Sequence, residues 1–563
     1  MGIPSYYRKL TRSCPRLIQS SYPASMNGGK RIQWFFMDYN CLIYHCLHRP
    51  DAPVYPLEAE TDESVKQTWT TLFIESVLDY TIHVIHQVMP EKGVYIAIDG
   101  VVPMAKMRQQ RLRRFKSSWM ASMGMSRDGK RGGDGDEKET ARWNTNAITP
   151  GTEFMDQLHT ALLRRIQQEG KSATWTISSC REPGEGEHKI MTQWRRGIYQ
   201  GPIAVYGLDA DLIVLSLLGI ERCNLQDPVW LFREAMERGS IQYDMFGQES
   251  YEWFSIRELR QWLVKPYLGH TDQERSFILH YTFMMSFLGN DFLPSSLSYK
   301  MRDDGHSLLL DHLHDFFSRG QFLVDTTQDT LPIQFPVLLS FFQILALQEP
   351  KRIFDAILKK QEQARWSESA IGMREVGHDD WPLFVLEESI LLFTPSSLSS
   401  SSSSVSSLHS QWKHRYLTHF FHGFSDHSSS YSTICYHYLY GVQWIWAYYL
   451  GKMDQVCFEW YYPYSLPPLW EWLGQATSLP PFEGTVRVKP SDIQPTEQLA
   501  LVLPLDSWYL LPPCPQRELP YRAPHLFPSS FSFDSVGKRF FWECESMIPL
   551  PTISEVKAWC SSS

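Results

Sequence analysis

The segment IAVYGLDADL, residues 203–212, sets two acidic residues directly after a short apolar run. Residues 203–207 have the apolar, β-branched and aromatic composition of a buried strand. Asp209 and Asp211 follow on either side of Ala210, so both carboxylates can lie on one side of an extended or turning backbone. A strand that ends in acids is typical of a sheet whose carboxyl edge binds a ligand.

Other short apolar runs have the same composition, and longer stretches with helical spacing separate them. This alternation predicts an α/β fold with a mostly parallel sheet. Ligands of such sheets bind at the carboxyl ends of the strands. The further predicted strands are 32–37, 94–98, 173–177 and 229–232, and the predicted helices are 64–88, 153–169 and 186–198.

Seven acidic residues in the first part of the chain lie beside glycine or at the end of an apolar run. One such acid is most often a surface residue or a helix cap. Seven that converge on one sheet edge repel each other and need cations, and carboxylate oxygens are ligands for Mg²⁺ or Mn²⁺. Two such ions about 4 Å apart are typical of sites that cut phosphodiesters. The candidate ligands are Asp38, Asp99, Glu185, Glu187, Asp209, Asp211 and Asp291.

A basic stretch begins seven residues after Asp99. On a helix, four of its side chains share one face, which could bind a terminal phosphate through charge-assisted hydrogen bonds. The alternative is a solvated helix surface. The closeness to the acids favours an anionic ligand held between the two groups. The four residues are Lys106, Gln110, Arg113 and Arg114.

The chain divides into four parts by composition. Residues 1–300 carry the acids, 301–395 have helical patterns, 396–410 are serine-rich and suggest a linker or loop, and 411–563 are rich in aromatic residues. Residues 126–147 are charged and glycine-rich, which predicts a mobile loop. Most aromatic residues of 441–464 are expected in a core, and one or two could stack on nucleic-acid bases.

Bulk properties narrow the function further. The chain has 563 residues and a net charge of −9, with ten cysteines but no C-x-x-C pair. This predicts two to four structural units and reduced thiols. No apolar stretch is long enough for a membrane helix, and the N-terminus lacks the pattern of a signal peptide. We expect a monomer in the cytoplasm without membrane association, and a nuclear or virus-associated location stays an alternative.

Several long segments resemble the Xrn family of 5′→3′ exoribonucleases. The first set comprises MGIPSYYRKL, MDYNCLIYHCLH, AIDGVVPMAKMRQQRLRRF, NAITPGTEFM, REPGEGEHKIM, VYGLDADLIVLSL and FLGNDFLP. The second conserved region of that family resembles WYYPY, PTEQLALVLP and FSFDSVGKRFFWE. The resemblance implies a PIN/flap-nuclease-like α/β core, a helical extension, and a second, mixed α/β region that braces the active site.

The resemblance also implies an activity and roles for residues. Family members processively degrade single-stranded RNA with a 5′ monophosphate to nucleoside 5′-monophosphates, using Mg²⁺ or Mn²⁺. All seven acids fill metal-binding positions, and Lys106, Gln110, Arg113 and Arg114 fill the 5′-phosphate pocket. The base-stacking positions are Tyr44, where the family has histidine, and Trp460, by the WYYPY match. No segment identifies a protein partner.

Two other functions remain open from the residues alone. A flap or structure-specific DNA nuclease would use the same acids, although the segments quoted above resemble the RNA-degrading family. A non-catalytic RNA-binding protein on the same fold usually lacks one or two of the acids, and none is missing here.

Overall fold

A computed structural model shows how the chain folds. It describes residues 3, 5–23, 29–56, 62–122, 143–171, 174–207, 209–237, 240–244, 247–371, 412–414, 416–418, 421, 428–482, 488–534, 536, 538 and 543–561. The serine-rich segment 396–410 and most of the predicted loop 126–147 lie outside the described residues.

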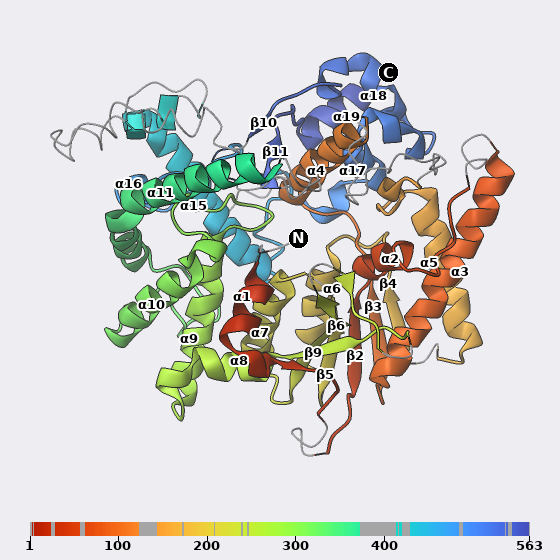
Figure 1. The fold of residues 1–563 in the computed structure, drawn as a ribbon, viewed down its shortest axis with the longest axis horizontal. Coiled ribbons are helices and arrows are strands. Elements are labelled where there is room, and N and C mark those ends of the chain that lie inside the picture. The colour runs from red at the N-terminus through yellow and green to blue at the C-terminus, as the bar shows by residue number, and fades with distance from the viewer. Residues whose placement is uncertain are drawn as a thin grey trace.

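A seven-stranded sheet forms the centre of the N-terminal part (Figure 1), in the order β1-β9-β6-β5-β2-β3-β4. The five strands from β4 to β6 run parallel, whereas β9 and β1 are antiparallel additions at one edge. The strands are β1 Ile18–Gln19, β2 Trp34–Asp38, β3 Gly93–Ala97, β4 Trp175–Ser178, β5 Ile203–Tyr206, β6 Val229–Glu234 and β9 Tyr251–Ser255.

All five strands predicted from apolar runs are present, and each of their ends lies within two residues of the predicted end. Their parallel pairing confirms the predicted mostly parallel sheet. The sequence did not predict β1 or β9. The first has only two residues, and the second is recognisable through its pairing with β6, in which Leu231 lies opposite Phe254.

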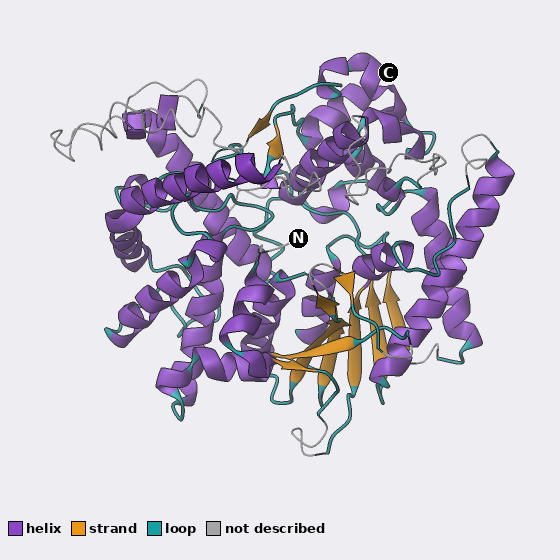
Figure 2. Cartoon of the chain, in the orientation of Figure 1, coloured by secondary structure: helices purple, strands orange, loops and turns teal. Residues whose placement is uncertain are grey.

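Helices cover the sheet on both faces and extend away from it (Figure 2). The three predicted helices appear as α3, α5 and α6, of which α6 ends four residues early. Side-chain caps start several of them, such as Thr152 at α5, as expected for helix N-termini. The N-terminal helices are α1 Tyr6–Ser13, α2 Tyr39–Leu47, α3 Glu63–Val88, α4 Met104–Ser122, α5 Glu153–Gln168, α6 Gly186–Trp194, α7 Asp211–Cys223, α8 Ile256–Leu263 and α9 Thr271–Met284.

The rest of the described chain is mainly helical. Among its described residues, the only strands are β10 Phe533–Asp534 and β11 Glu545–Ser546. Two further short strands, β7 Met236–Glu237 and β8 Ser240–Ile241, lie earlier in the chain, between β6 and β9. The helices are α10 Gly305–Ser318, α11 Phe335–Ile371, α15 Ser428–Tyr449, α16 Trp470–Leu473, α17 Pro495–Val502, α18 Leu519–Arg522 and α19 Ile553–Ser561. In the part of the chain that the structure describes, no helix has the length and hydropathy of a membrane span.

Helix α4 joins the sheet domain to the C-terminal region. Its Arg111 side chain is fully buried and donates hydrogen bonds to the carbonyl oxygens of Leu501, at 2.7 Å, and Pro549, at 3.1 Å. Figure 1 shows α4 beside α17, away from the strands of the seven-stranded sheet. Because these bonds fix one side of α4, the other side is held in a set position above the sheet edge.

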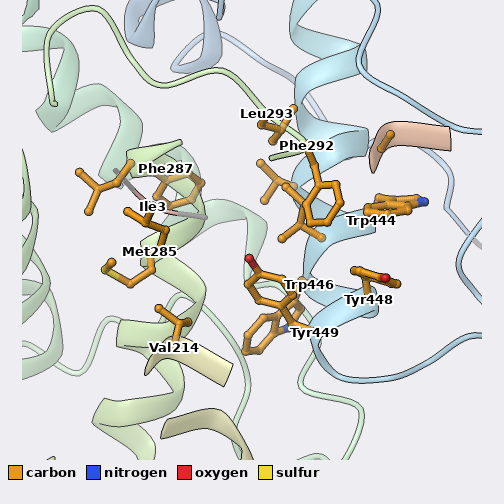
Figure 3. Packing of buried hydrophobic residues seen from close by; sticks show 14 of the residues in the cluster. Ile3, Val214, Met285, Phe287, Phe292, Leu293, Trp444, Trp446, Tyr448 and Tyr449 are labelled. Atoms are coloured by element: carbon orange, nitrogen blue, oxygen red, sulfur yellow. The ribbon is translucent and has the colours of Figure 1, made fainter. Parts of the chain in front are cut away.

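Aromatic side chains on α15 pack together with residues of the N-terminal part (Figure 3). The rings of Trp444 and Tyr448 stack with their centroids 5.0 Å apart, and Phe292 contacts both. These rings are buried, which confirms that most of the aromatic stretch 441–464 forms a core.

Candidate active site

A cavity of about 800 Å³ lies at the carboxyl edge of the parallel sheet. Acidic side chains from strand ends and cationic side chains from α4 both line it. Almost every site residue predicted from the sequence is on its wall. These are Asp38, Tyr44, Asp99, Lys106, Gln110, Arg113, Arg114, Glu185, Glu187, Asp209 and Asp291.

Parallel pairing brings the acids together. Asp38 ends β2 and lies opposite Ala97 of β3, so Asp99 follows at the same edge. Carboxylate oxygens of Asp38, Asp99 and Glu187 lie within 4.8 Å of one another. The backbone N–H of Gly186 donates to Asp99 Oδ1 at 2.7 Å. A side chain at Gly186 would place its Cβ 2.5 Å from Asp38 Oδ1, so only glycine allows this approach.

Asp211 is the one predicted acid that does not line the cavity. It begins α7, is 8% exposed, and its Oδ1 has no hydrogen-bond partner among the described residues. Its charge still acts on the site, since it contributes to the raised pKa of Asp38. It therefore lies close to the acids on the wall.

Burial and mutual repulsion raise the pKa values of these acids. Burial and then Asp99 raise the pKa of Asp38 well above its ordinary value, and burial and then Glu185 raise that of Glu187. The pKa of Asp211 is raised to about 7, by burial and then by Asp209. A cation bound between these carboxylates would stabilise their ionised form.

Lys106 shows how a cation fits the acids. Its Nζ lies 2.6 Å from Glu185 Oε2 and 2.7 Å from Asp291 Oδ2. Although burial opposes the negative charge of Asp291, the ammonium group lowers the pKa of that carboxyl to about 2. The predicted helical face is therefore divided, because Lys106 contacts the acids while the next turns of α4 face the open cavity.

Polar groups without a partner mark those next turns. Arg114 donates from Nη2 to Thr149 Oγ1 at 2.8 Å, whereas its Nη1 is buried without a hydrogen bond in the described part of the chain. Oε1 of Gln110 is also buried without a hydrogen bond in the described part of the chain. Buried groups of this kind are costly unless a ligand satisfies them. An anion with several oxygen atoms could accept from Arg114 and Arg113.

The two predicted stacking residues have different environments. Tyr44, on α2, is half-buried on the cavity wall. Trp460 is absent from the described lining and packs against Trp444, with ring centroids 5.1 Å apart, and against Tyr440. The base-stacking role of both residues stays a prediction.

Sequence reasoning missed Tyr448 and Asn40. The Tyr448 hydroxyl donates to Glu185 Oε1 at 2.8 Å, and Asn40 Oδ1 accepts from the Asp99 N–H at 3.1 Å. The aromatic stretch around Tyr448 was noticeable in the sequence, but nothing there pointed to Glu185. Asn40 follows Asp38 by two residues, a spacing that could have signalled a supporting role.

The site fits divalent cations chemically. Its ligand atoms are buried carboxylate oxygens, which suit hard ions such as Mg²⁺ and Mn²⁺. The ammonium of Lys106 is a cation already bound between two of the acids. Oδ1 of Asp211 has no hydrogen-bond partner among the described residues. The described residues thus form acidic clusters that could bind metal.

An α/β domain with these acids at its sheet edge has the fold of the PIN-like nucleases. Comparison with known families specifies the group further. Residues 1–225 match the family described as XRN 5′-3′ exonuclease N-terminus, and residues 401–559 match the Xrn1 helical domain. The chain belongs to the Xrn family.

Curated relatives agree with this assignment. The chain is 32% identical over 371 residues to 5′-3′ exoribonuclease 2 of Eremothecium gossypii, covering 55% of this chain and 37% of that protein. It is 32% identical over 372 residues to the protein of the same name from Saccharomyces cerevisiae, 55% of this chain and 35% of that one. It is 30% identical over 437 residues to the protein of the same name from Emericella nidulans, covering 65% of this chain and 40% of that protein. The match thus spans 35 to 40% of these relatives.

Proposed function

We propose that this protein is a processive 5′→3′ exoribonuclease that degrades RNA with a 5′ monophosphate to nucleoside 5′-monophosphates. One observation carries the proposal. Six of the seven acids line the same cavity as the cationic side chains of α4, and the charge of the seventh, Asp211, acts on them. Relatives named 5′-3′ exoribonuclease 2 support the reaction type.

The acids would hold two ions of Mg²⁺ or Mn²⁺, which when bound activate a water and stabilise the leaving oxygen. The residues themselves fix the geometry. Gly186 N–H orients Asp99, Tyr448 orients Glu185, and Lys106 ties Glu185 to Asp291. Because these contacts come from three segments, the acids stay in place while substrate moves past.

The α4 residues would select the end of the RNA. Gln110, Arg113 and Arg114 lie one to two helical turns beyond Lys106, so a phosphate on them sits beside the acids. Bidentate arginine contacts suit a phosphate with free oxygens. We propose that a cap or triphosphate is too large for the space between α4 and the acids, which limits the substrate to decapped RNA.

Each cycle would then shorten the RNA by one nucleotide. The new 5′ phosphate takes the place of the old one, and the next base comes to lie on Tyr44. Stacking on an aromatic ring tolerates any base, as processive degradation requires. We further propose that the protein acts as a monomer in the cytoplasm; a tagged protein that is nuclear would overturn the location.

The deciding experiment compares three substrates: single-stranded RNA with a 5′ monophosphate, its 5′-triphosphate twin, and a DNA flap. We expect Mg²⁺-dependent release of mononucleotides from the first alone. Asp209→Asn should abolish release, and Glu221→Gln is the matched control, because Glu221 is a buried acid of α7 that pairs with Arg260 outside the cavity. Equal decay of both RNAs, or preference for the flap, would contradict the proposal.

A further inference from the structure

A second group of titratable side chains lies at the other end of the same cavity. His45 is on α2, seven residues after Asp38, about 10 Å further along the helix. Glu234 ends β6, and Glu249 precedes β9. Of these, His45 and Glu234 line the cavity. We name His45, Glu234 and Glu249 the His45 cluster; it is separate from the seven acids.

The three side chains converge on one point. His45 Nε2 lies 3.2 Å from Glu249 Oε2, 3.3 Å from Glu249 Oε1 and 3.9 Å from Glu234 Oε1. One ligand atom from each residue falls within 4.8 Å of the others. Ligands about 2.1 Å from a common metal ion lie about 3 to 3.5 Å from each other, so the spacing is close to that of a coordination sphere.

One tyrosine hydroxyl lies between the two carboxylates of the cluster. The Tyr80 oxygen lies 2.7 Å from Glu234 Oε1 and 2.5 Å from Glu249 Oε2. A phenol has one proton, which it donates to only one of these carboxylates. Burial, and then the charge of Glu234, raise the pKa of Tyr80 well above its ordinary value, so the phenol keeps its single proton.

The charges are also unbalanced. Arg49 Nε lies 3.2 Å from Glu249 Oε1 and its guanidinium covers the Tyr80 ring, which compensates one carboxylate. Glu234 is 1% exposed, and its Oε1 accepts from the Tyr206 hydroxyl at 2.7 Å. Its Oε2 is buried without a hydrogen-bond partner in the described chain. Buried carboxylate oxygens without a partner are rare, and a cation bound to Glu234 would compensate this one.

We propose that His45, Glu234 and Glu249 bind a transition-metal ion of the Zn²⁺ type, at a site distinct from the acid cluster. An imidazole nitrogen with two carboxylates suits Zn²⁺, whereas Mg²⁺ prefers oxygen ligands alone. The hydroxyls of Tyr80 and Tyr206 would orient the carboxylates from behind. The cavity supplies the path by which the ion arrives.

Such an ion would have a structural consequence for the cavity. It would tie α2 to β6 and to the segment before β9, and α2 carries Tyr44 next to His45. The site therefore lies where the end of α2 must stay fixed if Tyr44 is to contact a ligand. This inference rests on the cluster alone and stands whether or not the protein degrades RNA.

The test counts Zn²⁺ ions by mass spectrometry after dialysis against Zn²⁺ with excess Mg²⁺. We expect one more Zn²⁺ per chain in the wild type than in Glu234→Gln or His45→Gln. Glu221→Gln, a buried acid elsewhere, should retain the ion. Because all variants keep the ten cysteines, binding to thiols cancels in the difference.

A double variant, Asp209→Asn with Asp211→Asn, separates the two sites. It should keep the Zn²⁺ ion, and Zn²⁺ should raise its unfolding temperature. Adding His45→Gln or Glu234→Gln to it should remove that rise. Equal Zn²⁺ content in the wild type and both cluster variants would overturn the site, since a proton then balances the charge. Loss of the ion from the double variant would overturn it too, because the ion would belong to the acid cluster.

Discussion

The hydroxyl of Tyr448 donates a 2.8 Å hydrogen bond to Oε1 of Glu185, a residue 263 positions earlier in the chain. Both groups are buried, and the ring of Tyr448 stacks on Trp444. The aromatic layer of α15 thus reaches a predicted metal ligand directly. This is one contact between the C-terminal region and the candidate site, in addition to the hydrogen bonds from Arg111 of α4.

Removing the hydroxyl should loosen Glu185 without emptying the core. We expect Tyr448→Phe to lower kcat about tenfold, because a hydrogen bond to a charged group contributes about 1.5 kcal/mol. The KM for RNA should change little, and the Mn²⁺ concentration for half-maximal activity should rise. Steady-state kinetics at several Mn²⁺ concentrations measure both effects.

Tyr438→Phe is the matched control. Tyr438 is equally buried on the same helix, and its ring contacts Tyr462 rather than the acids. It should keep the wild-type Mn²⁺ dependence. If both variants lose activity alike, the hydroxyl of Tyr448 has no special effect on Glu185.

Two arginines of α4 should differ in their effect on substrate choice. Arg113 lines the main cavity, whereas Arg108 does not and pairs with Glu545 at 3.0 Å. We expect Arg113→Ala to reduce kcat/KM for 5′-monophosphorylated RNA 10- to 100-fold, the range of one or two charge-assisted hydrogen bonds. For 5′-hydroxyl RNA it should change little, and Arg108→Ala should leave the ratio of the two substrates unchanged.

The site acids should lower the stability of the metal-free protein as the pH rises from about 5 to 7.5. The pKa of Asp211 is about 7 in the folded state, raised by burial and then by Asp209, against an ordinary value of 3.8. Between these values the folded state binds more protons than the unfolded state, so the free energy of unfolding decreases with pH. Asp38 and Glu187, whose pKa values are also raised, add in the same direction.

Thermal unfolding in EDTA at several pH values checks this slope. Asp211→Asn should flatten it, because the amide cannot ionise. Asp291 does not counteract it, since Lys106 lowers the pKa of that carboxyl to about 2 and its stabilising contribution is lost only below its ordinary pKa. Added Mg²⁺ should restore stability at pH 7.5 and release protons. The same slope in Asp211→Asn as in the wild type would show that this acid is ionised without metal.

The two predicted stacking residues should be separable by kinetics. Tyr44→Ala should raise the KM for RNA about tenfold or more, as expected for loss of one base–ring stack, while Tyr44→Phe should stay near wild type. Trp460 packs among rings of α15, so Trp460→Ala should also cost about 3 to 5 kcal/mol of stability. An unchanged KM in Trp460→Ala would remove that residue from base binding.

How far the sequence predicts this protein depends on the distance between interacting residues. The β2 strand and Asp38 are adjacent in the chain, and the periodicity of α4 places Gln110 and Arg114 together. Such local patterns predicted the sheet and the acids. Strands β1 and β9 were not predicted, because β1 has only two residues and β9 is recognisable through its pairing with β6.

By itself, the sequence determined which acids end strands and which cations share a helix face, since a parallel sheet sends all its carboxyl ends to one edge. Tertiary structure alone decided that Lys106 enters the acids, that Tyr448 supports Glu185, and that His45 meets Glu234 and Glu249. The physical reason is that these contacts join separate elements. Their geometry depends on how α2, α4 and α15 pack over the sheet, which no local spacing of residues encodes.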